Sequence, residues 1–78
     1  MIKFKYLFNG VHHYGFARKY LSQNADRYLI LLGDGLTLIL AQSDDQAIWI
    51  QIPKNGETNQ DNELIQALGA GLLDGKLI

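Results

Sequence analysis

The apolar residues near the N-terminus alternate with polar ones, which is the pattern of a half-buried β-strand. Asn9-Gly10 ends this segment and is the strongest short signal for a two-residue hairpin turn. The pattern predicts strands over 2–8 and 11–21. The register set by the turn pairs Phe4 with Gly15, so that large inner-face residues lie opposite small ones.

The middle of the chain, residues 28–41, is apolar in almost every position. A Gly-Asp-Gly sequence interrupts it, and Asp34-Gly35 is the expected turn of a second hairpin with strands over 27–32 and 36–42. An antiparallel sheet that faces water on one side should be polar on that side. Both faces of this hairpin are apolar, so its second face needs a cover.

A two-residue turn at Asp34-Gly35 pairs Leu31 with Leu38 on one face of the hairpin and Ile30 with Ile39 on the other. We expect a second copy of the chain to cover the exposed face, or the sheet to close into a barrel. The dimer is the preferred alternative. The residues expected at its interface are Tyr28, Ile30, Ile39 and Trp49.

The C-terminal half predicts one more strand, over 46–52, which ends at Pro53 because proline cannot continue a ladder. A capping sequence begins at Thr58, and the apolar positions then take helical spacing, which predicts a helix over 59–73. We therefore expect one α+β domain over 1–78. Its curved, five-stranded antiparallel sheet runs in up-down order and carries the helix on one face.

The chain has 78 residues, no cysteine and a net charge of −1. These features predict a cytoplasmic protein without disulfides or thiolate metal sites, and no apolar run is long enough for a membrane span or a signal peptide. The charge is unevenly distributed, because residues 1–27 contain five of the seven cationic side chains and only one acid, Asp26. A basic N-terminal half is one feature of polyanion binders.

Six of the eight aromatic residues fall within the first twenty positions, among lysines and arginines. Exposed rings with basic neighbours on a strand surface stack single-stranded bases and hold phosphates in β-sheet modules. In the predicted register, half of these rings lie on the inner face of the sheet and belong to the core. The residues that remain as candidates for nucleic-acid binding are Lys3, Lys5, Tyr14, Phe16 and Arg18.

Catalytic patterns are weak in this sequence. His12 and His13 are adjacent on a strand and therefore point to opposite faces, so they cannot readily bind one metal ion. No activated-nucleophile motif is present. We expect no enzymatic activity, no cofactor and no metal site.

The sequence thus favours a non-catalytic interaction module that forms a homodimer through an apolar sheet face and binds an unidentified protein partner. Single-stranded nucleic-acid binding by the N-terminal hairpin is the first alternative. Binding of a small ligand at the dimer interface is the second.

Overall fold

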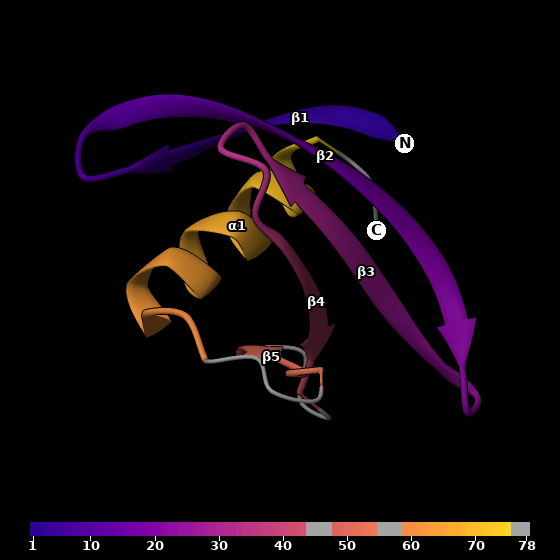
Figure 1. The fold of residues 1–78 in the computed structure, drawn as a ribbon. Helices are drawn as coiled ribbons and strands as arrows, with labels where there is room; N and C mark the ends of the chain where they lie inside the picture. Colours follow the sequence, from indigo (N-terminus) through magenta and orange to yellow (C-terminus); the bar gives the residue numbers. More distant parts are fainter. Residues whose placement is uncertain (44–47, 55–58, 76–78) are drawn as a thin grey trace.

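The computed structural model describes residues 1–43, 48–54 and 59–75, and it confirms the α+β fold predicted from the sequence (Figure 1). Within these residues, five antiparallel strands form one open sheet in the order of the chain, and a single helix follows them. The elements are β1 (Ile2–Phe8), β2 (Val11–Ser22), β3 (Ala25–Leu32), β4 (Thr37–Gln42), β5 (Trp49–Gln51) and α1 (Asn62–Asp74).

The first hairpin has the register that its turn predicts. Phe4 pairs with Gly15, and Phe8 pairs with Val11 next to the turn. Asn9 and Gly10 have φ angles of 52° and 76°, the left-handed conformation that a type I′ turn requires at both central residues.

The connection between β2 and β3 is tighter than the sequence suggests. The predicted strands leave residues 22–26 as the connection, but β2 extends to Ser22 and β3 begins at Ala25. The two turn residues, Gln23 and Asn24, adopt φ angles of 52° and 63° and so form a second two-residue turn without glycine. Residues 20–22 of β2 and 25–27 of β3 lie beyond the pairs with β1 and β4, and they form a two-stranded arm (Figure 1).

The register predicted for the β3–β4 hairpin is wrong by one residue. Ile30 pairs with Leu38 and Leu29 pairs with Ile39. The loop has three residues rather than two: the amide of Gly35 donates to the Leu32 carbonyl at 3.0 Å, and Gly35 has a φ of +89°. A slip of one residue exchanges the faces of a strand.

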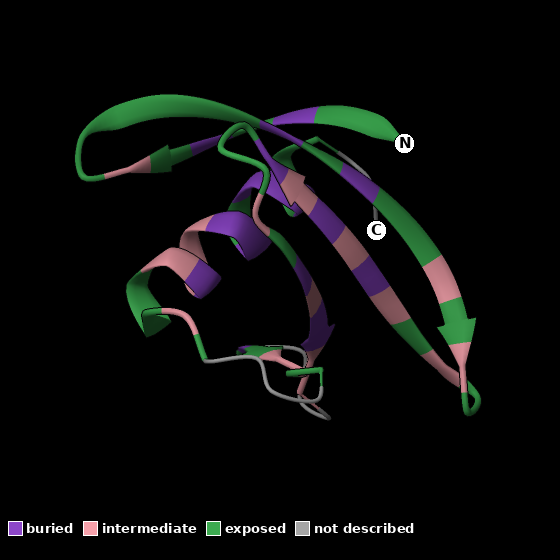
Figure 2. Cartoon of the chain, in the orientation of Figure 1, coloured by how far each residue is buried: buried purple, intermediate pink, exposed green. Residues whose placement is uncertain are grey.

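Helix α1 lies inside the curl of the sheet, in contact with both edge strands, β1 and β5 (Figure 1). The side of the sheet that faces α1 is therefore concave, and we call it the inner face. Buried residues alternate with more exposed ones along β1, β3 and β4 (Figure 2). The core of the inner face and the helix includes Phe4, Tyr6, Tyr28, Ile30, Leu38, Leu40, Trp49, Ile65, Leu68 and Leu72.

Two helix glycines allow this close approach. A Cβ atom at Gly71 would lie 2.7 Å from the Lys5 carbonyl oxygen and 2.8 Å from the Tyr6 Cβ, and one at Gly69 would overlap the Trp49 indole. The side chain of Gln66 adds a polar link to β5. Its Oε1 accepts from the Trp49 amide at 3.1 Å, and its Nε2 donates to the Trp49 carbonyl at 2.7 Å.

The ends of the last two elements differ from the predicted ones. Helix α1 begins at Asn62, and Asp61 occupies the N-cap position without a side-chain cap hydrogen bond. Thr58, where the capping sequence begins, lies outside the described residues, as do residues 46 and 47 of the fifth predicted strand. At the other end, the amide of Gly75 donates to the Gly71 carbonyl at 2.9 Å and closes the helix.

The glycine contact predicts that Gly71→Ala destabilises the protein, although alanine favours a helix by about 1 kcal/mol over glycine. Overpacking against the backbone of β1 costs about 1–3 kcal/mol and outweighs this gain. Urea denaturation followed by circular dichroism measures the difference. Gly33→Ala is the matched control, because a Cβ there meets nothing within 4 Å. Equal or higher stability of Gly71→Ala would contradict the proposed close contact.

Burial raises the pKa of the Tyr28 hydroxyl above its ordinary value of 10.0, because the anion would lose its hydration. A raised pKa in the folded state gives stability that is complete below pH 10 and is lost as the pH rises through the folded value. We therefore expect the free energy of unfolding to fall above about pH 10, and to fall less steeply in Tyr28→Phe. Urea titrations across this pH range measure both slopes, and identical slopes would contradict the prediction.

Candidate functional site

The side of the sheet opposite α1, which we call the outer face, carries the residues with functional character. A central row runs along β2, where alternate side chains point outward. We call this row the β2 stripe, and it consists of Tyr14, Phe16, Arg18 and Tyr20. Tyr14 and Phe16 are 56% and 41% exposed, so their rings are accessible on the folded protein.

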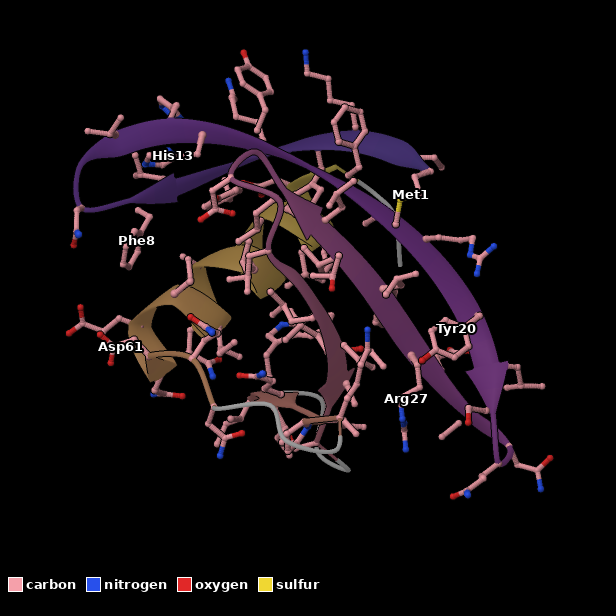
Figure 3. The ribbon with its side chains drawn as sticks, viewed as in Figure 1. Met1, Phe8, His13, Tyr20, Arg27 and Asp61 are labelled. Atoms are coloured by element: carbon pink, nitrogen blue, oxygen red, sulfur yellow. The ribbon has the colours of Figure 1, made fainter. Side chains whose placement is uncertain are left out.

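Cationic side chains flank the β2 stripe on both neighbouring strands. Lys5 lies opposite Tyr14 and Lys3 lies opposite Phe16 on β1, while Arg27 lies opposite Tyr20 on β3. The Lys3 ammonium nitrogen lies 4.4 Å from the centre of the Tyr14 ring, a cation–π contact. Tyr20 and Arg27 project from the arm formed by β2 and β3 (Figure 3). Each ring of the stripe thus has a cation on the adjacent strand.

Charge is segregated between the two sides of the sheet. Within the described strands, the outer face carries Lys3, Lys5, Arg18 and Arg27 and no acidic side chain. The inner-face pair Lys19 and Asp26 lies 3.5 Å apart. The other described acids lie in the β3–β4 turn or on α1 and its N-cap, and they are Asp34, Asp61, Glu63 and Asp74.

The centre of the outer face, next to the stripe, is aliphatic. Leu29 and Ile39 form a cross-strand pair, and Leu31 lies beside Phe16. These three side chains are half-buried, and Ile50 at the far edge is 49% exposed. The outer face therefore offers apolar contact area as well as charge.

All five residues predicted for nucleic-acid binding lie on the outer face of β1 and β2. Of the four residues predicted for a dimer interface, only Ile39 lies there. Tyr28, Ile30 and Trp49 are buried in the core beneath α1, with exposures of 1%, 0% and 5%. They are not available on the surface of the folded chain.

Sequence reasoning missed Arg27 and Tyr20 as part of this surface. The predicted strands leave residues 22–26 unpaired, so they do not predict the cross-strand pair of Tyr20 and Arg27. The alternation along β2 contains a signal for Tyr20. This residue is an even number of positions from Tyr14, Phe16 and Arg18, so all four side chains point to the same face.

The histidines lie on opposite faces, as the sequence predicts. His12 is opposite Leu7, whereas His13 stacks on the ring of Tyr6 with 5.4 Å between ring centres. Within residues 1–43, 48–54 and 59–75, no group of three or more histidine, aspartate or glutamate side chains is placed to hold a metal ion.

Comparisons of the chain with protein-family models, with curated proteins and with solved structures found no match. In the part of the chain that the structure describes, no helix has the length and apolar character needed to cross a bilayer.

Proposed function

We propose that this protein is a non-catalytic binding module whose outer face binds single-stranded nucleic acid along the β2 stripe. The observation that carries the proposal is the composition of this face: exposed rings at Tyr14 and Phe16, cations beside them, and no acidic side chain on the outer side of the described strands. Rings stack unpaired bases of any sequence, and lysine and arginine side chains neutralise the phosphates.

The shape of the outer face also favours a flexible ligand. The sheet curls around α1, so its outer face is convex. A single strand can bend over a convex surface and place successive bases on the stripe. A duplex is itself convex and keeps its bases stacked inside, so it would contact only the cations.

The predicted cytoplasmic location is consistent with this proposal, because a chain without cysteine needs no oxidising compartment. Access to cellular RNA or single-stranded DNA follows from that location. The proposal requires no cofactor and no metal ion.

Binding of a fluorescently labelled oligothymidylate, measured by fluorescence anisotropy, tests the proposal. We expect affinity to fall steeply between about 50 and 200 mM salt, because bound phosphates release counterions. A duplex of the same length should bind more weakly. Absence of any binding at about 50 mM salt and tens of micromolar protein would contradict the proposal, since even non-specific polyanion binders register there.

Two substitutions separate stacking from charge. Tyr14→Ala should weaken binding by about 5- to 150-fold, which corresponds to about 1–3 kcal/mol for a stacked base. Lys5→Ala should lower the slope of the salt dependence by about 0.7. Lys19→Ala is the matched control, because it removes the same charge from the inner face. An equal effect of Lys5→Ala and Lys19→Ala would show that net charge, and not the outer face, governs binding.

Self-association is a second candidate, and the aliphatic centre of the outer face is the observation that favours it. Two copies that meet at Leu29 and Ile39 would bury apolar area that a lone chain leaves half-exposed. Lys3 and Lys5 would then lie at the rim, on edge strand β1. The convex shape and the like charges of the two faces limit the strength of this contact.

The dimer hypothesis predicts a mass of twice 8.8 kDa by light scattering, with a melting temperature that rises with protein concentration. Ile39→Glu should give a folded monomer, whereas Ile30→Glu should unfold the chain because Ile30 is fully buried. Circular dichroism confirms folding of each variant. A wild-type monomer whose melting temperature is constant over a hundredfold dilution would contradict self-association.

A further inference from the structure

A second surface feature lies at the Tyr14 end of the β2 stripe, and Tyr14 is one of its lining residues. A cleft of about 460 Å³ opens between the β1–β2 hairpin, the β3–β4 turn and the start of α1. Its volume falls in the range of small-ligand pockets. The residues that carry the argument are Tyr6, Phe8, His13, Asp34, Leu36 and Leu64.

The walls of the cleft combine aromatic and aliphatic surface. Phe8, Leu36 and Leu64 are half-buried and pack against the core, so each has a side that faces the cleft. Tyr6 is buried at the base, and His13 stacks on it. Figure 3 shows the side chain of Phe8 hanging from β1 toward the space beside the start of the helix.

Among the described residues, Asp34 is the one acidic residue that lines this cleft. Its Oδ1 accepts a hydrogen bond from the Leu36 amide at 3.0 Å, which holds the carboxylate in place within the turn. No lysine or arginine among the described residues forms an ion pair with it. Its negative charge also reaches the buried ring, because Asp34 adds to the effect of burial in raising the pKa of the Tyr6 hydroxyl.

This arrangement favours a cation with an apolar surface over an anion. A carboxylate next to aromatic faces is the recognition chemistry of alkylated ammonium ions, which are held by ring quadrupoles and by opposite charge together. We propose that the cleft binds a small organic cation of the alkylammonium class, with Phe8 as its aromatic wall and Asp34 as its counterion. This site shares Tyr14 with the nucleic-acid interface proposed for the outer face, but its aromatic wall and its counterion are residues that the interface does not use.

Choline chloride is the probe, titrated into ¹⁵N-labelled protein and followed by amide chemical shifts. We expect saturable shifts in the β1–β2 hairpin and in residues 33–36, with a dissociation constant of about 1–10 mM. Sodium chloride at the same ionic strength serves as the blank. The uncharged isostere 3,3-dimethylbutan-1-ol should bind at least about fivefold more weakly, because it lacks the cation–π and ionic attraction.

Two variants identify the residues responsible. Asp34→Asn retains the acceptor for the Leu36 amide but removes the charge, and it should weaken choline binding by at least about fivefold. Phe8→Leu keeps an apolar wall without a π face, and it should weaken choline binding while leaving the isostere unchanged. Asp74→Asn, at the other end of α1, is the matched control.

Saturable choline shifts with both variant effects would establish the site even if oligothymidylate does not bind. Equal affinity for choline and its isostere would overturn the proposal, as would unchanged choline binding in Asp34→Asn. Absence of saturable shifts up to about 100 mM choline would overturn it as well.

Discussion

The close contact between α1 and the two edge strands is the constraint on which the rest of the fold depends. Gly71 lets the helix approach the backbone of β1, and Gly69 accommodates the indole of Trp49 on β5. A single helix can therefore fill the concave side of a five-stranded sheet, provided that the sheet curls around it. Larger residues at these two positions would push the helix away from the strands, and the core around Leu68 and Leu72 would lose its packing.

The curl in turn separates two chemical environments. The concave side holds the core and, around it, the described acids, including Asp34 near the β3–β4 turn. The convex side exposes the β2 stripe and its flanking lysines and arginines. This separation exists because β1, β2 and β3 place their cations at outward positions of the alternation, with Lys19 as the exception. The two proposed ligands are a single-stranded nucleic acid and a small organic cation. They match the positive charge of the convex side and the negative charge of the concave side.

The sequence predicted most of the fold because its hairpins carry local signals. Asn9-Gly10 set the register of the first hairpin correctly. The Gly-Asp-Gly connection allowed loops of two or three residues, and only the three-residue loop brings Leu38 and Leu40 into the core with Ile30 and Tyr28. Local turn preference could not decide the length of this loop, because the favoured length depends on which face of the sheet the helix covers. For the same reason, the sequence could not show that Tyr28, Ile30 and Trp49 lie beneath α1. The register of the first hairpin is enough to place its basic and aromatic residues on the outer face. The cleft at Asp34 joins three distant segments and could not be derived from spacing.

The carboxamide of Gln66 has a consequence for how this protein avoids aggregation. A sheet edge usually presents unpaired amides and carbonyls that recruit a strand from another molecule. At Trp49 the Gln66 side chain already supplies both a donor and an acceptor, in the manner of a neighbouring strand. At the opposite edge, Lys3 and Lys5 place charge on β1, which disfavours edge-to-edge pairing. Side chains thus occupy or charge part of each edge of the open sheet, an arrangement that disfavours edge-to-edge pairing.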